Sequence, residues 1–130
     1  MKNFTLDEAN SYIPWLEEVF QKLFQMQEHI LSRQDKMSET MRLGRRNGGS
    51  SISTEMQDAK GKIEEEQQSL RRLLEKVTAK GIVVRDITRG LIDFPHIRDG
   101  REVYLCWIRG EEVIRFWHDT DMGFAARQPL

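Results

Sequence analysis

The chain contains one cysteine, Cys106, among its 130 residues. A single cysteine cannot form an internal disulfide bond or a metal cage built from several thiolates. Its scarcity is typical of proteins kept in a reducing compartment. We therefore expect no disulfide framework, and the fold has to rely on an apolar core.

Long apolar runs are also missing. No stretch approaches the roughly 18 consecutive apolar residues that a membrane-spanning helix needs. The opening MKNFTLDEAN leads into charges every few positions, not into the apolar centre of a signal peptide. We expect a soluble, cytoplasmic protein with no membrane partner.

An excess of charge of either sign is absent, because 20 basic residues face 21 acidic ones. Nonspecific binding to DNA or RNA requires a strong positive field, so no nucleic acid partner is expected. No motif in the sequence requires a cofactor or fixes a substrate. The composition thus leaves protein contacts and small ligands as the open classes of partner.

What is present begins with a helical period at the N-terminus. Apolar residues recur in alternating steps of three and four, which predicts one long helix: Leu6, Ala9, Ile13, Leu16, Phe20, Leu23, Ile30, Met37 and Met41. Thr5 and Glu8 have the spacing of a capping box at its start. Pro14 lies inside the pattern and predicts a bend or a change of helix there.

A second helical pattern follows the helix-breaking stretch GRRNGGSS, from Gly44 to Ser51. It starts near Ser53 or Thr54 and ends before Gly81, which is suited to a left-handed C-terminal residue. The short connection predicts an antiparallel helical hairpin of coiled-coil type over residues 1–80. Helices this long exceed the width of a domain of this size, so their distal half must either project or find a partner. Projection fits the seam, where Gln27, Gln34 and Glu66 occupy positions that a dry core would fill with leucine. The simplest way to supply a partner is a homodimer with four helices, and we expect one.

The period changes to two after Gly81, which predicts an antiparallel meander over residues 81–130, ending in a C-terminal tail. Four strands are expected, at Ile82–Ile87, Leu91–Ile97, Arg101–Arg109 and Glu112–Asp119. Together with the hairpin, this is a single-domain α+β protein whose sheet packs on the base of the helices.

Two turns, Asp99-Gly100 and Gly110-Glu111, set the predicted register if both have two residues. Ile92 then faces Trp107 in one hairpin, and Val103 faces His118 in the next. In this register Cys106 and His118 lie on opposite faces of the sheet, which argues against a nucleophile and base pair. A β-bulge would reverse that parity.

Several segments resemble a known family. FTLDEANSYIPWL, GIVVRDITRGLIDFP, GREVYLCWIRGEE, IRFWHD and GFAARQPL occur in order, and together they are similar to the bacterial and archaeal domain of unknown function 2203 family. The resemblance implies no established activity, substrate or cofactor, so it transfers no catalytic residue. One departure is GFAAR, where the family pattern leads us to expect GFAGR. Alanine at position 126 restricts the backbone conformations that glycine would allow in this tail.

One candidate site lies at the end of the sheet. Two imidazoles and two carboxylates there are ligand types for a divalent metal ion: His96, His118, Asp119 and Asp121. The two histidines are separated by a whole strand, roughly 9 to 10 Å at the strand spacing. The competing interpretation, which we favour, is a pair of hydrogen-bonded histidines at strand ends.

A second candidate is a ligand site on the face turned away from the helices. Arginine guanidinium groups beside aromatic rings would suit a small anion. The residues of this candidate site are Asp93, Tyr104, Cys106, Arg115, Trp117 and Arg127. The competing and favoured interpretation is an ion pair between Asp93 and Arg115 that the C-terminal tail covers.

Two functions follow from these patterns. The favoured one is a non-enzymatic protein that acts through oligomerisation or protein contacts, with the methionines of the hairpin in its core or dimer seam. The alternative is a protein or enzyme that binds a small anion or a divalent metal around Asp93, Arg115, His118 and Arg127.

Overall fold

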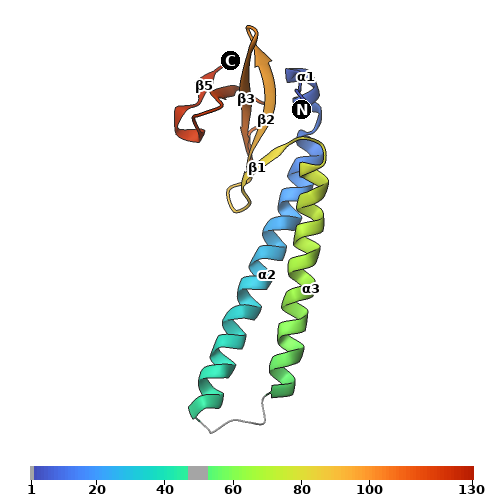
Figure 1. Cartoon of the computed structure of the whole chain (residues 1–130), viewed down its shortest axis with the longest axis vertical. Coiled ribbons are helices and arrows are strands. Elements are labelled where there is room, and N and C mark those ends of the chain that lie inside the picture. Colours follow the sequence, from blue (N-terminus) through green and yellow to red (C-terminus); the bar gives the residue numbers. More distant parts are fainter. Residues whose placement is uncertain (1, 47–52) are drawn as a thin grey trace. The chain divides into compact units, whose positions relative to one another are not determined.

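A computed structural model describes residues 2–46 and 53–130 of the chain, and it has an α+β architecture (Figure 1). Three helices come first, α1 (Leu6–Ser11), α2 (Ile13–Arg46) and α3 (Ser53–Thr78). The strands that follow are β1 (Val83–Asp86), β2 (Leu91–Arg98), β3 (Arg101–Ile108), β4 (Phe116–Asp119) and β5 (Gln128–Pro129), with a 3₁₀ turn, η2 (Phe124–Ala126), before β5. No helix in these residues is long and apolar enough to cross a membrane.

The capping box at the first helix is confirmed. The Thr5 hydroxyl accepts a hydrogen bond from the Glu8 amide at 3.1 Å, and the Glu8 carboxylate accepts one from the Thr5 amide at 3.2 Å. The predicted change of helix is confirmed as well, since α1 ends at Ser11 and α2 begins at Ile13. Pro14 therefore lies in the first turn of α2, where a missing amide hydrogen costs nothing.

The ends of the two long helices differ from the prediction in one respect. Gly44 does not break the first helix, because α2 continues to Arg46. The rest of the predicted break, Asn47 to Ser51, lies outside the described residues, as does Ile52. The end of α3 agrees with the sequence, since Gly81 has a left-handed φ of 91° and its amide donates to the carbonyl of Thr78 at 2.9 Å.

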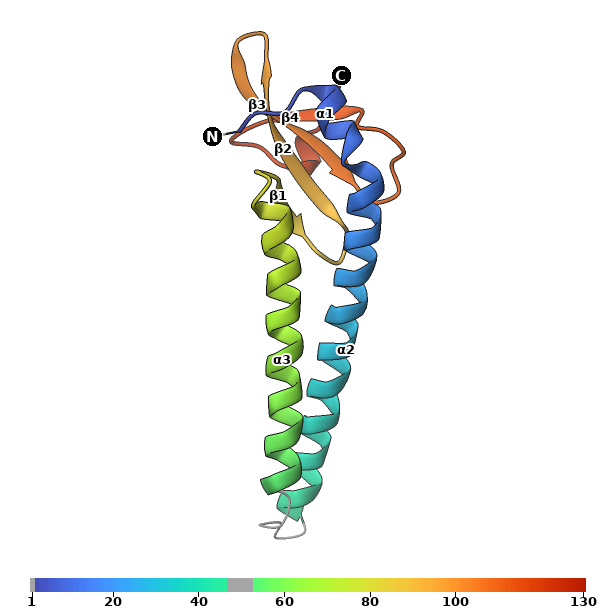
Figure 2. The ribbon, with the colours of Figure 1, turned by 90° about the vertical axis from the view of Figure 1, so that its right-hand side faces the viewer.

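Contacts within the chain group its residues into two compact units. Unit 1 contains Met1–Leu23 and Leu73–Leu130, and unit 2 contains Phe24–Arg72. Both α2 and α3 contribute to each unit. Within unit 2 the two helix segments run side by side in opposite directions (Figures 1 and 2).

The sheet of unit 1 has five antiparallel strands in the order β1-β2-β3-β4-β5. The prediction of four strands is thus wrong by one, because the tail returns as β5 beside β4. The predicted pairing of β2 with β3 is confirmed at every position, from Leu91 opposite Ile108 to Arg98 opposite Arg101. Asp99 and Gly100 both have positive φ, the conformation that a two-residue hairpin turn requires.

The predicted register between β3 and β4 is wrong by one residue. Val103 pairs with Asp119, and Tyr104 pairs with His118. The segment between Ile108 and Phe116 does not form a two-residue turn, because two side chains bind its backbone amides or those beside it. Asn10 accepts a hydrogen bond from the Ile114 amide at 2.8 Å, and Glu111 accepts one from the Ile108 amide at 2.8 Å. This shift reverses the faces of every residue in β4.

One face of the sheet packs on the helical part of unit 1. The ring of Phe94 meets Phe4 edge-on at 5.2 Å, and the ring of Trp107 lies 6.3 Å from Phe20 of α2. All four side chains are fully buried. The opposite face carries Asp93, Tyr104 and Cys106, and this is the face on which the candidate site lies.

Candidate functional site

Three neighbouring strands each place one polar or thiol side chain at the same point of this opposite face. Asp93 of β2 is paired with Cys106 of β3, and His118 of β4 lies one row away on the same face. Their exposed fractions are 2%, 0% and 1%. One ligand atom from each, a carboxylate oxygen, the thiol sulfur and an imidazole nitrogen, lie within 4.8 Å of one another.

Asp93 is held by two cationic or potentially cationic groups. Its Oδ2 accepts a hydrogen bond from Arg85 Nε at 2.8 Å, and its Oδ1 lies 3.0 Å from His118 Nε2. The hydrogen bond to Asp93 raises the pKa of Arg85 above its ordinary value, against the effect of burial. Arg85 also lies over the ring of Tyr104, 5.1 Å from its centroid. A buried carboxylate is thereby paired and oriented, as burial demands.

His118 has a fixed orientation. Its Nδ1 lies 2.8 Å from the backbone carbonyl of Asp119. A carbonyl oxygen can only accept, so Nδ1 carries a hydrogen and donates it. Nε2 then faces Asp93 Oδ1 at 3.0 Å, and because both atoms are acceptors, this contact needs a proton or a metal ion between them. The ring nitrogen nearest the carboxylate is therefore the one that can bind a proton or a metal ion.

Cys106 lies in surroundings that keep its thiol neutral. Burial and, to a smaller extent, the charge of Asp93 together raise the pKa of this thiol to about 12, and Arg127 partly opposes both effects. A thiol with such a pKa is protonated at neutral pH and is a poor nucleophile. Cys106 and His118 do share a face, contrary to the prediction, but the thiol is not activated.

The C-terminal tail lies against this face. The guanidinium of Arg127 lies 4.2 Å from the ring centroids of both Phe116 and Phe124, and its Nη1 donates to the two carboxylate oxygens of Glu111 at 3.1 Å. Arg89 also lies over Phe124, at 4.7 Å. The tail is therefore fixed by stacking and by an ion pair, which agrees with the expectation that this chain's own tail covers the face.

The predicted ligand-binding residues are divided by the structure. Asp93, Tyr104, Cys106 and Arg127 come together, and the Tyr104 ring lies 5.5 Å from His118. Two further members do not join them. Trp117 is paired with Leu105 on the other face, where Arg98 and Arg101 lie over its ring, and Arg115 is exposed before the start of β4. Asp93 pairs with Arg85 in place of the expected Arg115.

The four predicted metal ligands are not brought together. His96 lies on the face with Val103 and Asp119, and its Nδ1 is 2.7 Å from the carbonyl of Phe4. Asp119 forms an ion pair with Arg101 at 2.9 Å. Asp121 is exposed. Only His118 of this set lies in the buried cluster.

Arg85 and Glu111 are the two residues that the sequence prediction missed. Arg85 lies where the pairing of β1 with β2 shifts register, between Val84 and Asp86, so the alternation of strand residues did not place it beside Asp93. Glu111 had no signal in the sequence either. It was placed in a turn, and its role depends on the tail returning to the sheet.

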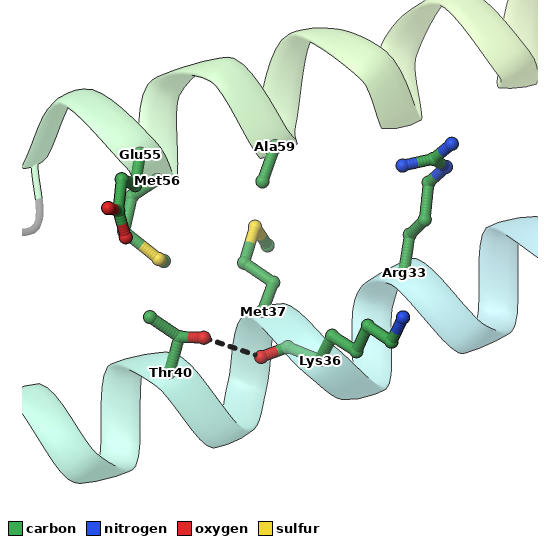
Figure 3. Close-up of a pocket in the computed structure, with 7 residues that line it drawn as sticks. All are labelled: Arg33, Lys36, Met37, Thr40, Glu55, Met56 and Ala59. Atoms are coloured by element: carbon green, nitrogen blue, oxygen red, sulfur yellow. Dashed lines mark hydrogen bonds between the residues drawn. The ribbon is translucent and has the colours of Figure 1, made fainter.

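A second candidate lies within unit 2, between the segments of α2 and α3. A hollow of about 220 Å³ separates them, lined by Arg33, Lys36, Met37, Thr40, Glu55, Met56 and Ala59. Figure 3 shows Met37 and Met56 reaching into this space from opposite helices, with the short side chain of Ala59 beside them. The interhelical seam is thus loosely packed at this position.

The comparisons with known proteins identify the family. The model of the family of uncharacterized conserved proteins DUF2203 matches residues 2–130, so the chain belongs to that family. The comparisons with curated proteins and with solved structures gave no match.

Proposed function

We propose that this DUF2203 protein is a non-enzymatic cytoplasmic assembly protein, and that two copies join as a homodimer through unit 2. In this arrangement each copy supplies two antiparallel helix segments, and the pair of copies forms a four-helix, coiled-coil-like layer. The second copy is the occupant that fills the hollow between Met37 and Met56.

The difference in apolar burial between the two units is the observation that carries this proposal. Among the described residues, unit 2 buries only two apolar side chains, Ile30 and Ile63, and all other buried apolar side chains belong to unit 1. Leu31, Met41 and Leu43 of unit 2 remain 50%, 37% and 44% exposed. Two helices with so little shared core gain little stability alone, and association with further helices supplies the missing burial.

A buried acceptor in unit 2 supports the same conclusion. Glu66 Oε1 accepts a hydrogen bond from Arg33 at 2.6 Å, but Glu66 Oε2 is buried and has no partner within the described residues. A buried oxygen without a donor costs about 1–3 kcal/mol. A donor from a second copy would remove this cost.

The absence of an activated nucleophile in the buried cluster supports a non-enzymatic role. Burial keeps the Cys106 thiol neutral in the metal-free chain. Arg127, which the anion alternative requires, already forms an ion pair with Glu111 through Nη1.

The test is the mass of the full chain in solution, measured by light scattering after size exclusion at micromolar concentration. We expect about twice the 15.3 kDa of one chain. Met37→Glu places a charge in the hollow and should give a single-chain mass. Ser38→Glu adds the same charge at the neighbouring exposed position and should leave the dimer intact.

Folding of unit 1 in the variants can be followed independently of their mass. All three tryptophans, Trp15, Trp107 and Trp117, belong to unit 1, so tryptophan emission reports on that unit and not on the mutated one. A single-chain mass for the unmodified protein contradicts the proposal. So does an equal loss of mass in both variants.

A further inference from the structure

We infer that Asp93, Cys106 and His118 form a binding site for Zn²⁺ or a chemically similar divalent transition-metal ion. The inference is independent of the proposed dimer, because all three residues belong to unit 1. It also replaces the predicted quartet of His96, His118, Asp119 and Asp121 with a different set of ligands.

The donor atoms suit this class of ion. Zn²⁺ binds imidazole nitrogen, carboxylate oxygen and thiolate sulfur, with bond lengths of about 2.0 to 2.3 Å, so tetrahedral ligands lie about 3.3 to 3.7 Å apart. Here Asp93 Oδ1 and His118 Nε2 are 3.0 Å apart, and all three ligand atoms lie within 4.8 Å. Small side-chain rotations would place them around one ion, with a water molecule in the fourth position. Mg²⁺ and Ca²⁺ are disfavoured because they select oxygen ligands.

The surrounding hydrogen bonds orient the ligands for a metal. The Asp119 carbonyl holds the hydrogen on His118 Nδ1, which directs the lone pair of Nε2 toward the cluster. Arg85 occupies Asp93 Oδ2 and leaves Oδ1 facing His118. Metal-bound histidines and carboxylates in proteins characteristically have such outer partners.

The local charges allow the ion to bind. Zn²⁺ coordinated by a thiolate and a carboxylate forms a neutral group, and the thiol proton is released to solvent as the Zn–S bond forms. The charge of Arg127 is offset by its ion pair with Glu111. The side chain of Arg85 is 43% exposed, so water screens its repulsion of the ion.

The experiment uses the full chain, stripped of metal with EDTA and then titrated with Zn²⁺ or Co²⁺. We expect one Zn²⁺ per chain by calorimetry, and a Co²⁺ spectrum with a thiolate-to-cobalt charge-transfer band. Cys106→Ser should weaken Zn²⁺ binding at least tenfold and abolish that band. His29→Gln removes an exposed histidine of unit 2 and should change neither result.

The result that overturns the inference is a chain that binds no Zn²⁺, or one whose Co²⁺ spectrum lacks the thiolate band. Unchanged Zn²⁺ affinity in Cys106→Ser overturns it as well. The Co²⁺ spectrum is measured on the unmodified protein, so the test remains decisive even if the variant fails to fold. Mg²⁺ serves as the negative control and should produce no calorimetric signal.

Discussion

Unit 1 and unit 2 bury their apolar side chains to very different extents, although the same two helices contribute to both. In unit 1 the helices meet a sheet that offers large flat rings such as Phe94 and Trp107. In the described part of unit 2 the two helix segments pack against each other without a sheet, and a hollow remains around Met37 and Met56. An amphipathic helix gains most of its stability from the surface it packs against, so one helix can be firmly held along part of its length and loosely held along the rest.

The largest expected difference between the units comes from truncating one buried side chain in each. Phe94→Ala should lower the free energy of unfolding by about 3–5 kcal/mol, because it leaves a cavity beside Phe4 in a fully buried position. In the dissociated chain Met56→Ala should cost less than about 1 kcal/mol, since this side chain borders a hollow until a second copy fills it. Urea denaturation followed by tryptophan emission and helical circular dichroism measures both. Equal losses of unfolding free energy in the two variants would contradict the conclusion that unit 2 is more loosely packed than unit 1.

A second contrast concerns two glycines, for which we expect effects of opposite sign. Gly90 of unit 1 has a φ of 63°, and a Cβ there would lie 2.5 Å from the Cβ of Arg109. Gly90→Ala should therefore destabilise the fold by about 1–3 kcal/mol. Gly61 lies inside α3 with open space around it, so Gly61→Ala should stabilise unit 2 by about 0.5–1 kcal/mol. The melting temperatures of the two variants measure both effects. A destabilising Gly61→Ala would mean that a second copy or another partner already packs closely against this surface of α3.

The smallest contrast is in alkaline stability, which should depend on unit 1 because it contains the only cysteine. Burial raises the pKa of Cys106 to about 12, whereas an unfolded chain has a thiol pKa of about 8.5. Between these values the unfolded chain has lost a proton that the folded chain retains. Stability therefore falls as pH rises, after a constant contribution below about pH 8.

Metal-free protein should accordingly lose about 1–2 kcal/mol relative to Cys106→Ser between about pH 8 and pH 10. Urea denaturation in EDTA at each pH gives the two free energies of unfolding. Parallel pH profiles for the two proteins would show that the thiol is not held in a buried, neutral state.

The sequence specified most of the local structure. The capping box of Thr5 and Glu8 and the change of helix near Pro14 depend on residues a few positions apart, and both are present. The pairing of β2 with β3 was equally predictable, because a two-residue turn at Asp99-Gly100 allows only one register between the strands it joins.

Only part of the buried cluster of Asp93, Cys106 and His118 could be predicted from the sequence. The pairing of Asp93 with Cys106 followed from the predicted register. The position of His118 did not, because a shift of one residue moves it to the other face. That shift is set partly by Asn10, which accepts a hydrogen bond from an amide 104 residues later in the chain.

By itself, then, the sequence determined the α+β class, the helix starts and the tight hairpin, since each depends on interactions between near neighbours. The tertiary structure alone decided the faces of β4, the return of the tail as β5 and the meeting of Asp93, Cys106 and His118. The physical reason is that β-strand side chains alternate with a period of two. A shift of one residue in the pairing of β4, set partly by a long-range hydrogen bond to Asn10, therefore decides which side chains share a buried site.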